Sequence, residues 1–419
     1  MRYSSVVGLC FGDEGKGSMT SYLCSQSNNP LIIRFNGGHQ AGHTVLYEGL
    51  RHTFSSFGSG TMQNVPTYWS KHCTFFPTAV YNEYKALQKM TIGGKTVSPI
   101  LYVDPLCPVT TPFDCIANQL FDNKNGHGSV GVGFGTTIKR QESYYKLYFQ
   151  DLFNKTVLEG KLNNIRHYYE HIEKIEMPHY INDSLLAWLK CIDELIKDGV
   201  ISKDKMGIKN IIKDFEYHSF DHIIFEGAQG VLLDMDFGFF PNVTRSNTTN
   251  KNVFGLMNNF NYYLPSWQTE DSKLDVYYMT RIYQTRHGNG YMTNQKYGEI
   301  KLINNENEIN LDSSFQGIFK KSILDLDLLN YALQCDSNFT ETVHSKTVVI
   351  TCLDQIEDKE RIQFTINKEL KTGTIKDVVS NIDSNYFILG EKEGMFSEQF
   401  QIPDMRYRSI CKFLPNTIY

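Results

Sequence analysis

The sequence predicts an α/β protein with a large, mostly parallel central sheet flanked by helices. Residues 4–11 and 31–35 are short apolar runs typical of buried strands, and a glycine turn and a helical segment, residues 18–26, separate them. Strand, turn, helix and strand in this order begin a parallel sheet. Two later apolar runs, residues 222–225 and 347–351, have the length and composition of further buried strands.

The chain of 419 residues is interpreted as one large α/β domain, residues 1–419, with insertions. Residues 61–220 form a helical insert region, in which apolar positions at helical spacing predict a helix over residues 180–198. Residues 340–419 form a C-terminal portion. The sequence contains no internal repeat and no low-complexity tract that would divide it further.

The composition argues against several classes of function. A net charge of -5 without a basic block is unfavourable for a nucleic-acid-binding protein, which needs a positive face. Nine cysteines without a C-x-x-C pair indicate reduced thiols rather than a disulfide framework or a zinc ribbon. The sequence has no signal peptide and no run of roughly 20 apolar residues, so we expect a cytoplasmic protein without a membrane partner.

Residues 8–17 (GLCFGDEGKG) follow the first predicted strand and precede the first helix. Their glycines let backbone N–H groups approach a phosphate, the helix N-terminus adds partial positive charge, and Lys16 adds a full charge. Gly17 stands where a Walker A loop has Ser or Thr, so this is a different phosphate loop. Asp13 and Glu14 place carboxylates beside the phosphate, which indicates metal binding or proton transfer. A tight turn with a solvated acid–lysine patch is the alternative.

Residues 36–44 (NGGHQAGHT) follow the second predicted strand. Ligands of parallel sheets bind beyond the carboxyl ends of the strands, so this loop and residues 8–17 should meet at one edge. His39 or His43 could exchange a proton there near neutral pH, although a histidine taken alone is more often structural. 

Residues 225–230 (FEGAQG) and 243–249 (VTRSNTT) form a third pair of polar segments after a predicted strand. Gln229, in a glycine turn, can hydrogen-bond a base edge, and Thr244 and its hydroxyl neighbours can hold a phosphate. Runs of Ser, Thr and Asn taken alone are usually turns.

Together these segments resemble the adenylosuccinate synthetase family. That family carries G-D-E-G-K-G, G-G-x-x-A-G-H-T, F-E-G-A-Q-G-x-x-L-D and V-T-x-S-N-T-T in this order, and the similarity covers residues 5–60 and 220–290. The resemblance implies the P-loop-like fold of the family, a homodimer, and small-molecule substrates: IMP, L-aspartate and GTP, with Mg²⁺ as cofactor.

The resemblance also assigns roles to individual residues. Asp13 would be the general base toward the purine N1 and a magnesium ligand together with the carbonyl of Gly42. His43 would be the general acid, and Lys16 and Gln229 would complete the catalytic set.

The remaining expected contacts fall into three groups. The phosphates of GTP would be held by Gly12, Glu14, Gly15, Lys16, Gly17, Gly42, His43 and Thr44. The purine monophosphate would be held by Asp13, Gln40, Val130, Arg140, Gln229 and Thr244, with Arg140 reaching across the dimer interface. The guanine base would be read by Asp354 and Gly390.

The departures from the family pattern concern the amino donor and the phosphate donor. The family's arginine-rich loop, G-A-T-T-G-R-x-R-R-x-G-W-L-D, corresponds to residues 312–325, which contain no arginine. The amino-donor loop would instead present Phe315, Gln316, Gly317, Lys320 and Lys321. Lysine cannot grip a carboxylate through two parallel hydrogen bonds, so an amino donor with fewer carboxylates, or a lost ligase step, is predicted.

Other departures from the family pattern leave the identity of the bound nucleotides undetermined. Val130 replaces a phosphate-binding threonine, Cys352 replaces the lysine that covers the guanine, and only Gly390 remains of a terminal Ser-x-Gly-Pro motif. ATP is therefore an alternative to GTP.

The leading hypothesis is a GTP-dependent carbon–nitrogen ligase that makes adenylosuccinate in AMP biosynthesis. The first alternative is a paralogue with a changed amino donor, purine or phosphate donor, such as the viral relatives that use dGMP. That branch replaces the aspartate at position 13, so Asp13 argues against membership. The second alternative is a non-catalytic nucleotide sensor, which the joint presence of Asp13, Lys16, His43 and Gln229 disfavours. An unrelated P-loop NTPase is the weakest alternative, because the loop spacing is wrong.

Overall fold

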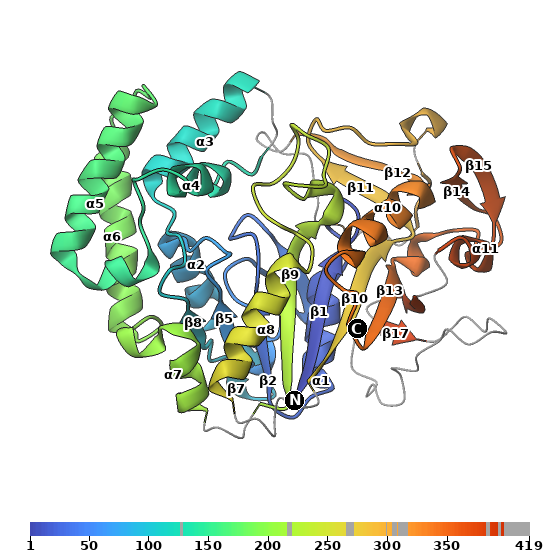
Figure 1. Cartoon of the computed structure of the whole chain (residues 1–419), viewed down its shortest axis with the longest axis horizontal. Helices are drawn as coiled ribbons and strands as arrows, with labels where there is room; N and C mark the ends of the chain where they lie inside the picture. The colour runs from blue at the N-terminus through green and yellow to red at the C-terminus, as the bar shows by residue number, and fades with distance from the viewer. Residues whose placement is uncertain are drawn as a thin grey trace.

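The computed structural model describes residues 1–125, 129–215, 220–264, 272–298, 300–303, 308, 317–382, 386–392 and 395–397. Within these residues, nine strands form a central sheet in the order β17-β16-β13-β10-β1-β9-β2-β5-β8 (Figure 1). All neighbouring pairs are parallel except β16 and β17. The strands are β1 (Arg2–Gly8), β2 (Pro30–Arg34), β5 (Thr67–Trp69), β8 (Leu101–Val103), β9 (His222–Gly230), β10 (Lys273–Arg281), β13 (Ser345–Thr351), β16 (Phe387–Lys392) and β17 (Met395–Ser397).

This sheet confirms the predicted fold class and the four predicted strands. The first strand is shorter than predicted, because β1 ends at Gly8 and the glycine loop begins there. β9 is longer, because the extended backbone continues from the apolar run through Gly230. The central sheet is buried on both faces, which explains the nearly continuous apolar runs of β1, β2 and β9.

Helices cover both faces of the sheet. Alternate residues of β1 point to opposite sides: Val6 joins the cluster under α1 (Lys16–Ser25), whereas Val7 joins the larger cluster on the other face. The larger cluster contains residues from α7 (Gly207–Asp214), α8 (Lys251–Tyr263) and α10 (Leu326–Ser337).

A third layer lies beyond the β8 edge, where the helices of the predicted insert region gather (Figure 1). Its helices are α2 (Pro77–Leu87), α3 (Pro112–Asn125), α4 (Phe134–Gln141), α5 (Lys155–His167) and α6 (Ile181–Lys197). The helix predicted over residues 180–198 is therefore confirmed as α6. Residues 61–220 also supply β5 and β8, so this region contributes strands to the central sheet as well as helices.

Smaller elements surround the sheet. Two antiparallel pairs are β3 (His43–Tyr47) with β4 (Leu50–Phe54), and β6 (Thr91–Ile92) with β7 (Lys95–Thr96). A second sheet has the order β11 (Tyr283–His287), β12 (Phe319–Asp325), β14 (Ile362–Ile366) and β15 (Glu369–Gly373), followed by α11 (Ile375–Ser380). In the described part of the chain, no helix has both the length and the apolarity needed to cross a membrane.

The carboxyl ends of the parallel strands meet at one edge, and three non-glycine residues with a positive φ angle lie there. Asp13 after β1, Gln229 near the end of β9 and Cys352 after β13 have φ angles of 56°, 55° and 60°. A positive φ costs a non-glycine residue free energy, so such positions persist where the surrounding structure fixes them, often at functional sites.

Candidate functional site

A cavity of about 1260 Å³ opens at this edge of the sheet. The loops after β1, β2 and β9 contribute to its wall, together with α4 and the turn after β11. Nine of the residues assigned from the sequence line this one cavity: Gly12, Asp13, Lys16, Gln40, Gly42, His43, Val130, Gln229 and Thr244. The parallel topology thus brings together four segments that are far apart in the sequence.

His43 is held by a buried carboxylate on β9. Its Nδ1 donates to Oε1 of Glu226 at 2.5 Å, and Glu226 also accepts hydrogen bonds from the backbone N–H, at 3.0 Å, and the hydroxyl of Ser59. Burial disfavours the charged form of Glu226, but His43 and Arg34 outweigh it, so the pKa of Glu226 lies below its ordinary value. Because Nδ1 is occupied, Nε2 is the ring nitrogen left for a ligand.

The protonation of His43 is under two opposing influences. Burial lowers the pKa of the imidazole, and the carboxylate of Glu226 acts in the opposite direction. The net shift is downward, which favours a neutral ring with its proton on Nδ1. A phosphate arriving beside Nε2 would add negative charge and favour the imidazolium form.

The backbone of Asp13 is held by a hydrogen bond, and its carboxylate lies in the cavity wall. Arg281 Nε donates to the carbonyl oxygen of Asp13, while the Asp13 side chain stays 26% exposed. Oδ2 of Asp13 lies 3.5 Å from Nε2 of His287, whose ring packs on Phe319. Asp13 is therefore available to a ligand, and its carboxylate lies beside the imidazole of His287 in a cavity wall that also contains His43.

Glu14 turns into the glycine loop rather than toward the cavity. Its Oε1 accepts from the backbone N–H of Cys10 at 2.6 Å, and its Oε2 lies 3.9 Å from Nζ of Lys16. A Cβ at Gly8 would lie 2.3 Å from that same Oε2, so only glycine fits there. The side chain of Glu14 therefore lies away from the cavity wall, and the predicted phosphate contact of Glu14 depends on its backbone amide.

The two glutamines in the cavity wall have unsatisfied polar atoms. Within the described residues, neither amide atom of Gln40 nor Oε1 of Gln229 has a hydrogen-bond partner, although all three are buried. Buried polar atoms are normally bonded, so orphaned ones in a cavity wall indicate a polar ligand.

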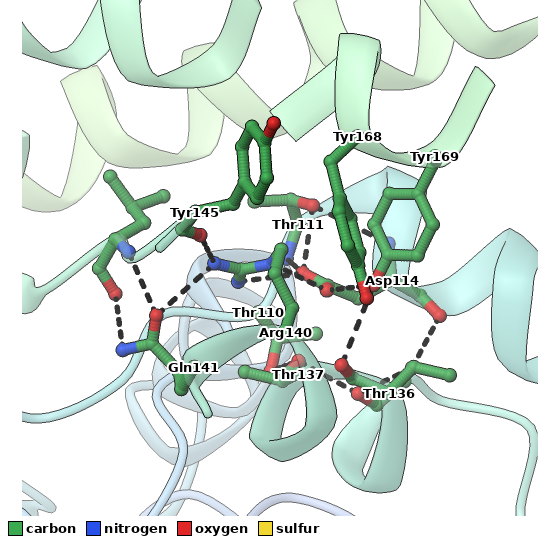
Figure 2. A network of polar contacts seen from close by, with 12 residues as sticks. Thr110, Thr111, Asp114, Thr136, Thr137, Arg140, Gln141, Tyr145, Tyr168 and Tyr169 are labelled. Carbon is green, nitrogen blue, oxygen red and sulfur yellow. Dashed lines mark hydrogen bonds and ion pairs between the residues drawn. The ribbon is translucent and has the colours of Figure 1, made fainter. Parts of the chain in front are cut away.

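The structure contradicts the prediction for Arg140, which is fully buried in its own subunit (Figure 2). Its Nε and Nη2 contact the carboxylate of Asp114 at 2.8 and 3.1 Å. Its remaining contacts are backbone carbonyls of Val109 and Tyr145 and the side chain of Gln141. A guanidinium with these partners cannot reach a nucleotide in another subunit, so Arg140 is a structural residue.

The amino-donor loop is described only in part. Phe315 and Gln316 lie outside the described residues. Nζ of Lys320 donates to the carbonyl oxygen of Gly290 at 3.0 Å, and Nζ of Lys321 lies 5.7 Å from the ring centroid of Phe319. Neither lysine, nor Gly317, belongs to the wall of the cavity.

The predicted guanine contacts lie at the same sheet edge but outside the cavity wall. Asp354 follows β13 in a short 3-10 turn, and Gly390 pairs with Ile350 of β13. Gly15, Gly17 and Thr44 also lie outside the wall. Gly17 has a separate role, because a Cβ there would lie 2.9 Å from the Cβ of His43. His39 is structural: it contacts the carbonyl of Val132, and burial lowers its pKa to about 4.

Several residues of the site were not identified from the sequence. Glu226 could have been found, because a carboxylate directly after an apolar strand run must be stabilised by a partner. Arg281, Arg286 and His287 belong to no quoted motif and reach the site only through the turn from β10 into the antiparallel strand β11.

Comparison with known proteins identifies the family of the chain. The family model described as adenylosuccinate synthetase matches residues 5–386. Adenylosuccinate synthetases of Histophilus somni (strain 129Pt) and Shewanella woodyi are each 31% identical, over 248 and 256 residues. These matches cover 58% of this chain and 55% and 56% of the relatives, so the chain spans about half the length of the curated relatives it matches.

Two solved structures share the fold. The fully ligated adenylosuccinate synthetase of Plasmodium falciparum has a TM-score of 0.65 at 19% identity and covers 88% of this chain and 82% of its own. The succinoaminodeoxyadenylate synthetase of cyanophage S-2L, bound to dGMP and to dATP as an energy donor, has a TM-score of 0.56 at 15% identity, covering 93% and 91%. With a family model matched over most of its length and a sheet edge that carries the family's four motifs, this chain belongs to the adenylosuccinate synthetase family.

Proposed function

We propose that this chain is a nucleoside-triphosphate-dependent carbon–nitrogen ligase acting on a purine nucleoside monophosphate. IMP, L-aspartate and GTP are the default substrates, and adenylosuccinate is the default product. The observation that carries the proposal is that Asp13 and the Glu226-anchored imidazole of His43 line one cavity with Lys16.

The reaction would proceed in two steps. Asp13 would accept the proton from N1 of the purine, so that O6 becomes an oxyanion and attacks the γ-phosphorus. The bond from that phosphorus to the β–γ bridging oxygen would break, and the nucleoside diphosphate would leave. The amine would then add to C6 and displace inorganic phosphate. Nε2 of His43 and Nζ of Lys16 would stabilise the charge on the transferred phosphoryl group.

The oxygen ligands present suit Mg²⁺, which proteins commonly bind through one or two carboxylates together with substrate phosphates. The described residues contain no cluster of three or more His, Cys, Asp and Glu side chains that could hold a metal alone. The carboxylate of Asp13 and the carbonyl of Gly42, both in the cavity wall, would hold the ion. Bound Mg²⁺ would neutralise phosphate charge during the transfer.

The phosphate donor and the purine are separate questions. The cyanophage relative uses dATP as its energy donor and binds dGMP, so ATP, dATP and dGMP belong in the substrate panel. The retained Asp13 favours a substrate with an N1 proton to remove, which both IMP and dGMP carry. A homodimer also stays a prediction, and light scattering in solution measures it.

Phosphate release and product mass test the proposal. The protein is incubated with Mg²⁺, IMP or dGMP, and GTP or ATP, with and without each of a panel of amino acids. A nucleotide whose mass equals the purine nucleotide plus the amino acid minus water supports the ligase. Tight nucleotide binding without turnover for any amino acid would support the nucleotide sensor instead.

A further inference from the structure

Besides Arg286, two positively charged side chains line the cavity outside the glycine loop, and neither has a role in the contacts described so far. Lys139 lies on α4, and Arg245 lies in the loop before α8. We propose that Lys139 and Arg245, with the start of α4, bind the phosphate of the purine nucleoside monophosphate. This assignment rests on the proposed function, because it concerns the second phosphorylated substrate of that reaction.

The charge of the substrates creates the need for such a subsite. Lys16 and the N-terminus of α1 belong to the glycine loop and suit the triphosphate. A phosphate monoester carries about two negative charges at neutral pH, so the monophosphate needs cations of its own. Arg140 cannot supply them, since its guanidinium is fully engaged in the protein interior. Arg286 lines the cavity but is committed to the backbone carbonyls of Tyr291 and Asn242.

Arg245 lies against the first turn of α4. A Cβ on Gly135 would be 4.0 Å from Cδ of Arg245, so the arginine stem passes directly over this glycine. Residues 134–136 line the cavity, and the first-turn amides of a helix have no intrahelical acceptor. This turn contains no acidic residue, so its partial positive charge is not offset locally.

The present partners of the two cations lie outside the cavity wall. Nη1 of Arg245 is 3.2 Å from Glu142, with the two side chains 48% and 54% exposed. Nζ of Lys139 is 2.7 Å from Glu173, and the lysine side chain is 40% exposed. Ion pairs this exposed contribute little to stability, so a phosphate can take over as the partner of either cation at small cost.

The balance of charge in the cavity wall favours an anion at this end. The acidic residues of the wall are Asp13 and Asp122, and the carboxylate of Asp122 already accepts hydrogen bonds from Asn118 and Ser129. Thr244 lies directly before Arg245 in the wall and adds a hydroxyl of the kind that commonly contacts phosphate.

Calorimetric titration of matched pairs of ligands tests the subsite. IMP and inosine, and dGMP and deoxyguanosine, differ only in the phosphate. Arg245→Met and Lys139→Met should each weaken binding of the preferred monophosphate about tenfold, and the double variant about a hundredfold, because charge-assisted hydrogen bonds are lost. Affinity for the matching nucleoside should not change.

Two controls separate phosphate binding from a structural role. Glu142→Gln breaks the Arg245 ion pair but keeps the arginine, so it should leave the monophosphate affinity intact. Arg166→Met removes an arginine of α5 that has similar exposure, pairs with Glu170 and lies outside the cavity wall, so it should change neither affinity.

Three results would overturn the inference. Arg245→Met could weaken the binding of nucleotide and nucleoside equally, or weaken the binding of neither. Glu142→Gln could also weaken monophosphate binding as much as Arg245→Met does. Wild-type protein that binds none of the four ligands would overturn the proposed function together with this inference. Wild-type binding with no phosphate-dependent loss in the variants would overturn the inference alone.

Discussion

Nδ1 of His43 lies 2.5 Å from Oε1 of Glu226, and both side chains are buried where β9 and the loop after β2 meet. A buried carboxylate fixes the orientation and the tautomer of the imidazole and stabilises its protonated form. The Glu226 carboxylate therefore holds His43 in one orientation in the same cavity wall that contains Asp13.

Replacing Glu226 by Gln should lower the rate of phosphoryl transfer about a hundredfold, the lower range for loss of acid–base assistance. The neutral amide can still accept from Nδ1, but it does not stabilise the imidazolium form. Stopped-flow phosphate release measures the rate. Ser59→Ala, which removes one hydrogen bond to Glu226, is the matched control and should cost less than about tenfold. A Glu226→Gln enzyme as fast as wild type would remove Glu226 from the mechanism.

Arg140→Met should destabilise the protein by about 3–5 kcal/mol, because it leaves the carboxylate of Asp114 buried without its cation. Urea unfolding measures the change. Asp114→Leu combined with Arg140→Met should recover part of the loss, since the double variant buries no unpaired charge. The KM for the monophosphate should stay at the wild-type value in all folded variants. An unchanged unfolding free energy with a raised KM would restore the cross-subunit role of Arg140.

Stability should fall as the pH drops below about 6.5, in part because of His222. Burial lowers the pKa of this histidine to about 3, so the folded protein keeps it neutral while the unfolded chain takes up a proton. His222 contributes its full stabilisation above the pKa that it has in the unfolded chain. This stabilisation is lost as the pH falls toward 3, at up to about 1.4 kcal/mol per pH unit. Between pH 6 and 4, the unfolding free energy of His222→Gln should change less steeply with pH than that of the wild type, by up to about 1.4 kcal/mol per pH unit. Identical slopes would show that His222 is not neutral in the folded state.

The glycine loops and buried strands could be predicted because local chemistry determines them. A run such as residues 222–225 is apolar because both faces of its strand are covered, and Gly8 is required because Glu14 fills the space beside it. Residues after parallel strands must meet at one edge, so Asp13 and His43 could be placed together before any coordinates.

The other site residues depend on contacts that sequence order does not reveal. No acidic residue lies three or four positions after Arg140 to pair with it. Its partner is Asp114, which lies 26 positions earlier, on α3. His287 reaches Asp13 because β11 turns away from the parallel sheet to pair with β12. Such pairings follow from tertiary packing, which outweighs local pattern.

In the proposed reaction, Asp13 removes a proton from the purine while His43 stabilises the transferred phosphoryl group in the same cavity. The most direct test is the release of phosphate from GTP or ATP in the presence of IMP or dGMP, compared between wild type and Asp13→Asn. We expect Asp13→Asn to lower this purine-dependent rate by at least about a thousandfold, within the range for loss of a general base, while both nucleotides still bind. Wild-type turnover by the Asp13→Asn enzyme would contradict it.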